Sequence, residues 1–275
     1  MTPDRLFVAN KPANIGSNRF LSKIKRRYGV KKAGFSGTLD PFAKGVLIIA
    51  FGRYTRVFRF LKKAPKTYRA TLWLGAFSET LDIEKITNIE TLMPFQNARI
   101  ENELDALIGE ITYLPPKYSA KKIDGTRAYD LARADKEVNL KLITSRVYDA
   151  KLIHYKHPFV TFDITISEGG YIRSMGQILC EKLGVQGSLS ALERLCEGDF
   201  VFDDEKALNP LDFLDLDENF YCNDTENLIL GRKLALEDFK IQDEGKYFVK
   251  LDKIISILEI KDDKVSYLLN GVRIC

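Results

Sequence analysis

The sequence predicts an α+β protein in which a large mixed body precedes a small β-rich module. In the body, segments that alternate apolar and polar residues, as strands do, lie between segments with apolar residues at helical spacing. Near Asp203 the composition turns acidic, and four short apolar runs follow: NLILG, YFVKL, IISILEI and VSYLLNG. With 275 residues, 45% of them apolar, the chain can bury a substantial core. We therefore expect two domains, residues 1–205 and residues 206–275.

The first predicted elements are a strand and a basic helix. The run RLFVANKP indicates a short strand that Lys11 and Pro12 close. The segment SNRFLSKIKRRYG indicates a helix that Ser17 caps and Gly29 ends. Its apolar face is formed by Phe20, Leu21, Ile24 and Tyr28, and its other face and the residues after it are basic: Lys23, Arg26, Arg27, Lys31 and Lys32. This basic face is either a solvated helix surface or a contact for phosphates.

The stretch GFSGTLDP, at residues 34–41, is too rich in glycine and serine for the interior of a strand. It precedes PFAKGVLIIAFG, which we interpret as a helix because proline suits the first helical turn. Asp40 is then the N-cap of that helix. From propensity alone, capping is the stronger interpretation of Asp40, and chemistry by its carboxylate is the alternative.

Later segments indicate two further strands and three further helices. KTYRATLWLG and FVTFDITI alternate as strands, with Tyr68 on the inward face of the first. ARIENELDALIG is an amphipathic helix, and a basic turn around Lys121 leads into a short helix. SEGGYIRSMGQILCEKLG is a glycine turn that runs into a helix, with Tyr171 and Arg173 at its start. The other inward residues expected in these elements are Ala70, Leu72 and Leu74; Phe162, Ile164 and Ile166; Ile100, Leu104, Leu107 and Ile108; and Ile172, Met175, Leu179 and Leu183.

Charge is distributed unevenly along the chain, although the net charge is only +4. From Phe202 onward there are 17 acids and 10 bases, whereas the residues before it hold 32 bases and 21 acids. A basic body with an acidic end favours a polyanion such as a nucleic acid as the partner of the body.

Several function classes are not indicated. No run of about 18 apolar residues predicts a membrane span, and no signal peptide opens the chain, so we expect a cytoplasmic protein. The four cysteines (Cys180, Cys196, Cys222 and Cys275) are scattered without a CxxC pair and are interpreted as reduced thiols. His154 and His157 share one segment without an acidic or cysteine partner, so we interpret them as surface loop residues and expect no metal site.

Motifs for nucleotide binding and for serine hydrolase chemistry are also missing. The sequence contains no GxxxxGK[ST] loop and no GxGxxG after a strand. A Ser-His-Asp set is implausible because both histidines lie on one short segment. The chemistry must therefore depend on carboxylate, tyrosine, lysine or arginine side chains.

Five segments resemble, in order, the TruB family of tRNA pseudouridine synthases. They are NKPANIGSN, GFSGTLDPFAKGVL, KTYRATLWLGAFSETLD, PPKYSAKKIDGTRAY and GGYIRSMGQILCEKLG, and together they span about residues 5–200. The tail resembles, more weakly, the family's reduced PUA-like C-terminal module. The resemblance implies the pseudouridine synthase catalytic fold, a mixed, largely antiparallel sheet flanked by helices.

The resemblance also implies a reaction and a partner. Members of this family isomerise uridine to pseudouridine, usually at position 55 in the TΨC loop of tRNA, without a metal or cofactor. The target base normally lies inside a folded loop, so the enzyme must flip it out. We expect a monomer that binds the T arm of tRNA and requires neither a membrane nor a protein partner.

Site residues follow from the same resemblance. Asp40 matches the catalytic carboxylate, and Tyr68 matches the tyrosine that packs on the uracil and removes a proton late in the reaction. Arg173 matches the arginine that pairs with the aspartate. Tyr171 and Leu192 fall on pocket positions, Lys11 and Pro12 on a supporting segment, and Phe35 on a position where the family has a histidine, so Phe35 must stack or pack instead. The basic residues expected to hold phosphates are Arg26, Arg27, Lys31, Lys32, Lys121 and Lys122.

These residue types suit the chemistry. A carboxylate can hold the uridine covalently, or stabilise the sugar cation while the freed uracil rotates. The carboxylate must be ionised, and both a nearby Arg173 and a helix start beneath Asp40 are expected to lower its pKa. Capping and catalysis by Asp40 are therefore compatible.

Two other functions remain open. One is an RNA-binding or tRNA-folding protein in which isomerisation is secondary or lost. The other is a relative that acts on other RNAs with guide RNAs in large complexes, although that subfamily usually carries a fuller PUA domain and long basic tails that this chain lacks.

Overall fold

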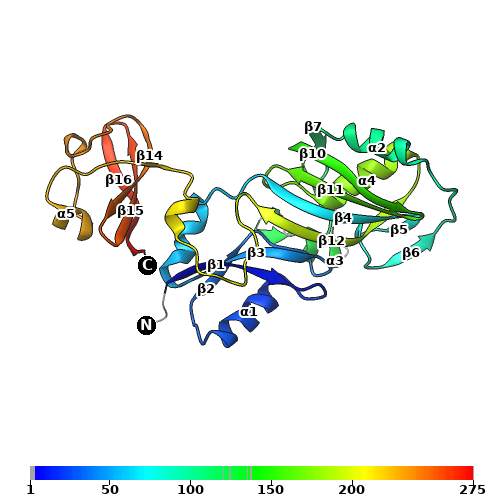
Figure 1. Ribbon diagram of the computed structural model, residues 1–275, viewed down its shortest axis with the longest axis horizontal. Coiled ribbons are helices and arrows are strands. Elements are labelled where there is room, and N and C mark those ends of the chain that lie inside the picture. The colour runs from blue at the N-terminus through cyan, green and yellow to red at the C-terminus, as the bar shows by residue number, and fades with distance from the viewer. Residues whose placement is uncertain (1–3, 120, 124, 135, 137, 275) are drawn as a thin grey trace.

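The structure is a computed structural model that describes residues 4–119, 121–123, 125–134, 136 and 138–274. Figure 1 shows an elongated molecule, with a large sheet and its helices at one end and a small sheet at the other. The large sheet has eight strands in the order β1-β3-β12-β4-β11-β10-β7, and β2 pairs with β3 outside this path. Its strands are β1 (Arg5–Lys11), β2 (Ala33–Ser36), β3 (Lys44–Phe51), β4 (Lys66–Leu74), β7 (Gly109–Tyr113), β10 (Ile143–Lys156), β11 (Phe159–Ile166) and β12 (Gly187–Glu197).

The pairing in this sheet is antiparallel except where β12 runs parallel to β3. The sheet is therefore mixed and largely antiparallel, which confirms the predicted fold class. The helices are α1 (Ser17–Arg27), α2 (Asn97–Asp105), α3 (Ala128–Arg133), α4 (Ile172–Leu183) and α5 (Thr225–Ile229), with 3₁₀ turns at Gly52–Phe60, Pro210–Phe213 and Leu236–Asp238. Helices α2 and α4 pack on the half of the sheet that contains β4, β10 and β12.

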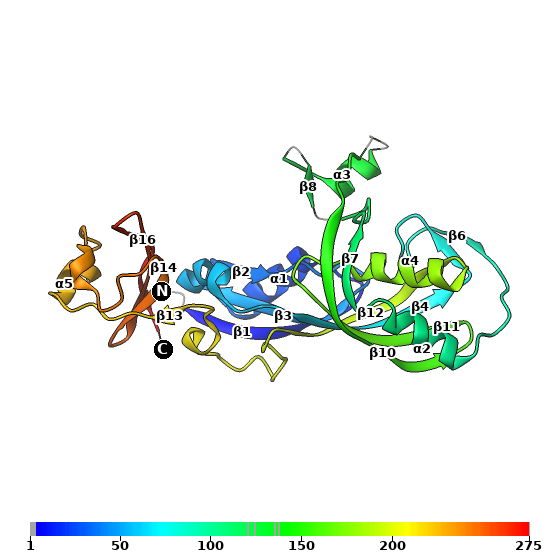
Figure 2. The ribbon, with the colours of Figure 1, turned by 90° about the horizontal axis from the view of Figure 1, so that it is seen from above.

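Two short hairpins stand at the edges of the body. One is formed by β5 (Ala76–Ser78) and β6 (Ile86–Ile89), and the other by β8 (Lys122–Ile123) and β9 (Thr126–Arg127). Figure 2 shows β8 and α3 projecting from the body above β7 and β10. The described residues 121–123 and 125–129 of the segment PPKYSAKKIDGTRAY belong to this projection, and Tyr118 at its base lies beside the site described below.

The expected inward faces of β4, β11 and α4 are confirmed, because every residue assigned to them is buried. The prediction that Ile108, at the end of the segment ARIENELDALIG, faces inward is wrong. Ile108 is 48% exposed, because α2 ends at Asp105 and the chain turns before β7 begins at Gly109.

The helix predicted after Asp40 is wrong, because Lys44–Phe51 forms the strand β3. Its side chains enter two different cores. Leu47 and Ile49 pack on one face against Phe20 and Ile24 of α1, whereas Val46 and Ile48 pack on the other face. A strand buried on both faces has a continuous apolar sequence that periodicity cannot distinguish from a buried helix. Asp40 is therefore not the N-cap of a helix.

The expected capping role of Ser17 is also wrong. The N-cap position of α1 is occupied by Gly16, and Ser17 is the first helical residue. The hydroxyl of Ser17 donates to the carbonyl of Leu39 at 2.9 Å and accepts from its N–H at 3.0 Å. This buried pair ties the start of α1 to the stretch that carries Asp40.

The C-terminal residues form a four-stranded sheet in the order β13-β14-β15-β16. The strands are β13 (Asp217–Glu218), β14 (Gly245–Leu251), β15 (Ile254–Lys261) and β16 (Lys264–Arg273), so three of the four predicted runs are strands. The run NLILG is instead mostly helical, in α5, because the Asp224 side chain accepts from the N–H of Glu226 and caps a helix there.

The segment between the two sheets stays close to the body. Leu208 donates a backbone hydrogen bond to Leu6, and Lys62 donates one to Phe213. Ile255 and Ile257 of β15 share a buried cluster with residues of β1 and β3. The domain boundary near residue 205 stays a prediction.

The cysteines and histidines lie on separate elements. Cys180, Cys196 and Cys222 are free thiols, burial raises the pKa of Cys180 to about 12, and Cys275 lies outside the described residues. His154 lies on β10 rather than in a loop, and His157 lies in the turn after it. Within the described residues, no group of three His, Cys, Asp or Glu side chains could hold a metal ion, and no helix has the length and apolar character needed to cross a bilayer.

Candidate active site

Asp40 lies in the connection between β2 and β3, and several contacts fix this connection. The backbone of Gly37 has a φ of +65°, in the left-handed region that favours glycine. The carbonyl of Gly37 accepts from Nη2 of Arg194 at 3.0 Å, and the carbonyl of Pro41 accepts from the N–H of Ile15 at 3.2 Å. With the Ser17–Leu39 pair described above, these contacts hold the backbone on both sides of Asp40.

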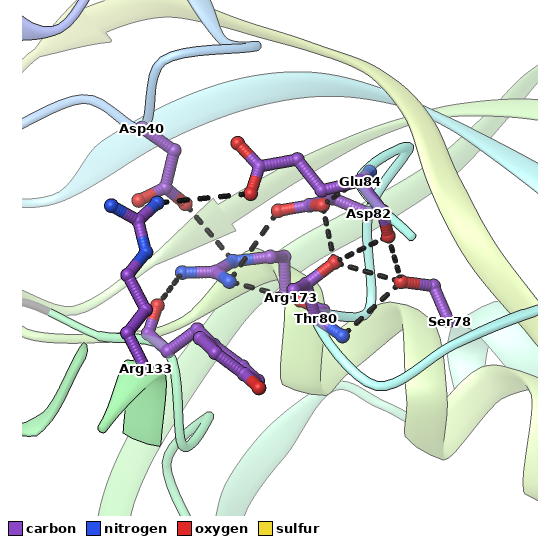
Figure 3. A network of polar contacts seen from close by, with 8 residues as sticks. Asp40, Ser78, Thr80, Asp82, Glu84, Arg133 and Arg173 are labelled. Atoms are coloured by element: carbon purple, nitrogen blue, oxygen red, sulfur yellow. Dashed lines mark hydrogen bonds and ion pairs between the residues drawn. The ribbon is translucent and has the colours of Figure 1, made fainter. Parts of the chain in front are cut away.

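Arg173, the second residue of α4, pairs with Asp40. Its Nε lies 2.9 Å from Oδ2 of Asp40, and Figure 3 shows the guanidinium at the centre of a polar network. Nη1 donates to the carbonyl of Thr80 at 2.9 Å, and Nη2 donates to the carbonyl of Tyr118 at 2.8 Å. Only 4% of the Arg173 side chain is exposed, so all three nitrogens are committed to fixed partners. A planar guanidinium held in this way fixes the direction from which it meets the carboxylate.

Asp82 is a second carboxylate in this network, and the sequence analysis did not identify it. Its Oδ2 lies 3.5 Å from Nη1 of Arg173. Its Oδ1 accepts from the hydroxyl of Thr80 at 2.6 Å and from the N–H of Glu84 at 2.9 Å. Asp82 lies in the turn after β5 and is the last residue of KTYRATLWLGAFSETLD, one of the segments that resemble the family, and this was the sequence signal for it. The pairing with Arg173 arises from tertiary contact.

The pKa of the Asp40 carboxyl is raised above its ordinary value, contrary to the expectation from sequence. Burial is the main cause, and the negative charges of Asp82 and Glu84 act in the same direction. Arg173 and Lys11 lower the pKa but do not reverse the effect of burial. One third of the Asp40 side chain faces a cavity, where water offsets part of the burial. The expected helix start, which would have lowered the pKa, is absent because β3 follows.

Lys11 lies at the end of β1 with its side chain completely buried. Its Nζ donates to the carbonyls of Ile15 at 2.7 Å, Pro12 at 3.0 Å and Pro41 at 3.5 Å. Burial lowers its pKa to about 8, against an opposing effect of Asp40. The lysine thus supports the backbone beneath Asp40, as the resemblance implies for its segment.

Two cavities meet at Asp40 and Arg173, which line both of them. The first, which we call the Tyr129 cavity, has a volume of about 260 Å³ and extends toward α1 and α3. The second, the Tyr68 cavity, has a volume of about 360 Å³. Its wall brings together Asp40, Tyr68, Tyr171, Arg173, Leu192 and Lys121, as well as Lys66, Glu168 and Arg194. Six of the sequence-predicted site residues therefore line one cavity.

The aromatic side chains of the Tyr68 cavity come from different elements. Tyr68 is on β4 and only 8% exposed, and Tyr171 is the residue before α4. The N–H of Tyr171 donates to the hydroxyl of Tyr113 at 3.0 Å, and burial raises the pKa of the Tyr171 phenol. Flat rings beside a carboxylate can hold a planar base by stacking.

Other predicted residues lie away from this cavity. Phe35, on β2, packs against the core between α1 and the large sheet and lines neither cavity. Lys31 and Lys32 are exposed after α1, where Lys31 lines a shallow groove with Arg26. Arg27 forms an ion pair with Glu205, so it is not a free phosphate contact. The side chain of Lys122 lies outside the described part of the chain.

The chain matches one protein-family model and is closely similar in sequence to several curated proteins. The model described as "TruB family pseudouridylate synthase (N terminal domain)" matches residues 25–172. The chain is 56% identical to tRNA pseudouridine synthase B of Sulfurimonas denitrificans, over 98% of this chain and 99% of that protein. It is 50% identical to the protein of the same name from Campylobacter jejuni subsp. jejuni serotype O:6, over 99% of this chain and 100% of that protein.

Solved structures share the fold at low sequence identity. A chain in the crystal structure of a Cbf5-Nop10-Gar1 complex superposes with a TM-score of 0.70 and 19% identity, over 98% of this chain and 84% of that chain. A chain in the structure of an H/ACA RNP bound to a substrate RNA containing 2'-deoxyuridine superposes with a TM-score of 0.64 and 18% identity, over the same two shares. The matches extend over the large sheet and the C-terminal residues together.

Proposed function

The chain belongs to the TruB family of pseudouridine synthases, and from this premise we propose that it isomerises the uridine at position 55 of tRNA with Asp40 as the catalytic carboxylate. Relatives about 50% identical over nearly the full length are named tRNA pseudouridine synthase B, and this chain is accordingly an isomerase that converts uridine to pseudouridine in tRNA. The position in the TΨC loop and the roles of the residues are the proposal.

One observation carries the assignment of Asp40. Its carboxylate lies 2.9 Å from the buried guanidinium of Arg173, and the two residues line a cavity that also contains Tyr68 and Tyr171. A reacting nucleoside needs a carboxylate, a counter-charge that orients it and a flat surface for the base. All three requirements converge in the Tyr68 cavity.

In the proposed reaction, the bond between N1 of uracil and C1′ of ribose breaks. The Asp40 carboxylate either forms a bond to the nucleoside or stabilises the positive charge on the sugar. Uracil then rotates on the ring of Tyr68, and C5 bonds to C1′. The C5 proton leaves to a base, for which Tyr68 is proposed, and N1 gains a proton, so that atoms and charge balance.

The elevated pKa of Asp40 is compatible with this role. A carboxylate that burial makes less stable in its charged form is a better nucleophile than one dissolved in water. Arg173 opposes the rise in pKa and so favours the ionised form of the carboxylate. Burial of Asp40 thus favours its reactivity as a nucleophile, while the Arg173 guanidinium favours its ionised form.

Recognition of the tRNA is proposed to combine base flipping with contacts to phosphates. Flipping the uridine costs roughly a few kcal/mol, and stacking on Tyr68 and Tyr171 offsets it. Lys31, Lys32 and Lys121 are proposed to contact phosphates of the T arm without reading sequence. We further propose that the enzyme acts in the cytoplasm as a monomer, without a cofactor or a protein partner.

The test uses tRNA from a strain in which the gene is deleted. Pseudouridine at position 55 is expected to be absent, to return with the wild-type protein and not to return with Asp40→Asn. Purified Asp40→Asn should still bind tRNA, because the substitution keeps the shape of the side chain. Full modification of position 55 in the deletion strain would refute the proposal, and rescue by Asp40→Asn would refute the role of Asp40.

A further inference from the structure

Three cations and two carboxylates gather beside Asp40, and the reaction proposed above does not use them. Lys66, Arg194 and Glu168 line the Tyr68 cavity. Lys63 and Glu197 complete the group through ion pairs. We call these five residues the Lys66 cluster.

The buried half of the Lys66 cluster is centred on Glu197, which is completely inaccessible to solvent. Its Oε2 lies 3.0 Å from Nζ of Lys66, and its Oε1 lies 2.8 Å from Nη2 of Arg194. Neither oxygen receives a hydrogen bond of ordinary geometry, so these contacts are charge pairs. One buried carboxylate thus faces two cations, and the buried half carries a surplus positive charge next to the cavity.

This arrangement fixes the position of Lys66. Its side chain is 8% exposed, so its ammonium has little freedom to move. Gly37 packs closely against the Lys66 ammonium, since a Cβ atom on Gly37 would be only 3.0 Å from the lysine Nζ. Arg194 donates to the carbonyls of Val46 and Gly37, so this second buried cation is fixed to the same stretch of backbone.

The exposed half of the Lys66 cluster is a loose contact. Glu168 belongs to the glycine turn before α4, and its side chain is 57% exposed. Its Oε1 lies 3.7 Å from Nζ of Lys66 and 3.7 Å from Nζ of Lys63. These separations exceed hydrogen-bond length, and such exposed pairs contribute little stability. An anion with stronger contacts can therefore displace this carboxylate.

We propose that Lys63 and Lys66 form a binding subsite for a phosphate adjoining the target uridine, and that Glu168 occupies this subsite in the free enzyme. The inference rests on the proposed function, because it requires a nucleotide in the Tyr68 cavity. Binding of the RNA displaces Glu168, and a phosphate of the RNA then pairs with the ammonium groups of Lys63 and Lys66.

The spacing on β4 supports this assignment. Lys66 and Tyr68 are both buried, two residues apart on one face of the strand, and their Cα atoms are therefore about 7 Å apart. Within one nucleotide, base and phosphate are separated by a comparable span across the ribose. A base stacked on Tyr68, with its sugar at Asp40, places an adjoining phosphate within reach of Lys66. Phosphate is also a better partner than a carboxylate for two lysines, because it offers more charged oxygens.

A binding experiment with a T-arm hairpin tests the subsite. Lys63→Ala should weaken binding and reduce the slope of log affinity against log salt by about 0.7, the value for one phosphate contact on a single strand. Lys62→Ala, which removes an exposed neighbour of the same charge, should leave the slope of the wild type. Equal slopes for Lys63→Ala and the wild type would overturn the proposal.

Displacement of Glu168 is tested by a double-mutant cycle. Glu168→Gln should tighten hairpin binding about two- to fivefold, the range expected when an exposed ion pair no longer competes. The gain should be smaller when Lys63 is already alanine, because Glu168 then competes with the phosphate only at Lys66. Glu193→Gln, which removes an acid paired with Lys44 elsewhere on the surface, is the control for a general effect of charge. The same gain from Glu168→Gln in both backgrounds would show mere repulsion of RNA and would overturn the proposal.

A chemical substitution in the RNA identifies the phosphate without depending on the folding of a variant. Hairpins with a neutral methylphosphonate on the 5′ or the 3′ side of the target uridine are compared with the natural hairpin. One of the two should bind more weakly to the wild type, and lose the advantage given by Glu168→Gln. If neither linkage does so while the wild type still converts the natural hairpin to pseudouridine, this inference fails and the proposed function stands. If the hairpin is not converted at all, the proposed function fails first.

Discussion

The Nε atom of Arg173 lies 2.9 Å from Oδ2 of Asp40, and the remaining donors of the same guanidinium hold the carbonyls of Thr80 and Tyr118. One side chain therefore joins three segments that are far apart in sequence: the connection after β2, the turn after β5 and the base of the projection that carries α3. Arg173 positions the carboxylate as well as compensating its charge, and replacing it by lysine separates these two effects.

Arg173→Lys should lower kcat by about 100-fold or more while changing KM for tRNA little. Lysine keeps the positive charge but cannot satisfy Asp40, Thr80 and Tyr118 with one planar group. Steady-state kinetics on tRNA measure the effect. Arg69→Lys is the matched control, because Arg69 makes a two-point contact with Asp163 on the sheet, outside both cavities. A mere rise in KM would contradict the positioning role.

The acid limb of the pH–kcat profile should lie above pH 3.8, the ordinary pKa of an aspartate, because burial raises the pKa of Asp40. Asp82→Asn removes a negative charge that contributes to this rise, so it should move the limb to lower pH. The position of the limb is the readout, whatever the height of the profile. A limb that stays in place, or moves to higher pH, would show that Asp82 does not act on the charge of Asp40.

Substitutions of Tyr68 should separate stacking from proton transfer. Tyr68→Phe keeps the ring and should lower kcat by about 10²–10⁴-fold with nearly normal binding of RNA. Tyr68→Leu should in addition weaken binding by about 1–3 kcal/mol, because it removes the stacking surface. Single-turnover kinetics and equilibrium binding distinguish the two. Equal activity of Tyr68→Phe and the wild type would exclude the phenol as the base.

The buried Lys11 should make folding stability rise with pH over a defined window. Its folded pKa is about 8 and its ordinary value is 10.5, so between these values the unfolded chain binds more protons and the free energy of unfolding rises with pH. The rise due to Lys11 should reach about 3 kcal/mol. Urea unfolding of the wild type and Lys11→Met at pH 8 and pH 10.5 measures it. An unchanged difference between the two proteins would contradict the lowered pKa.

Glu197 should be far more important for stability than its neighbour on β12, Glu193. Glu197→Ala leaves Arg194 buried without its counter-charge and leaves Lys66 with only the loose contact to Glu168, so it should cost about 3–5 kcal/mol. Glu193→Ala breaks a partly exposed pair with Lys44 and should cost less than about 1 kcal/mol. Chemical denaturation of both variants provides the comparison. Similar losses would mean that Glu197 does not neutralise the buried cations.

The sequence by itself identified six residues that line the Tyr68 cavity, but not Lys66, Glu168 or Arg194, which line it too. Short segments that resemble the family identified Asp40, Tyr68 and Arg173 without knowledge of the fold. The alternation of apolar and polar residues around Tyr68 also predicted a strand. Its failures were also local. The apolar run of β3 has no periodicity because both of its faces are covered, and periodicity alone does not distinguish such a strand from a buried helix.

Only the tertiary structure decided which charges meet. Asp82 pairs with Arg173, and Glu197 lies beneath Gly37, through contacts between elements that are distant in the chain. Burial, which raises the pKa of Asp40 although Arg173 lies beside it, likewise depends on the atoms of the whole site. A sequence pattern reports the propensities of residues close in the chain, whereas electrostatic free energy depends on distance and solvent access in space.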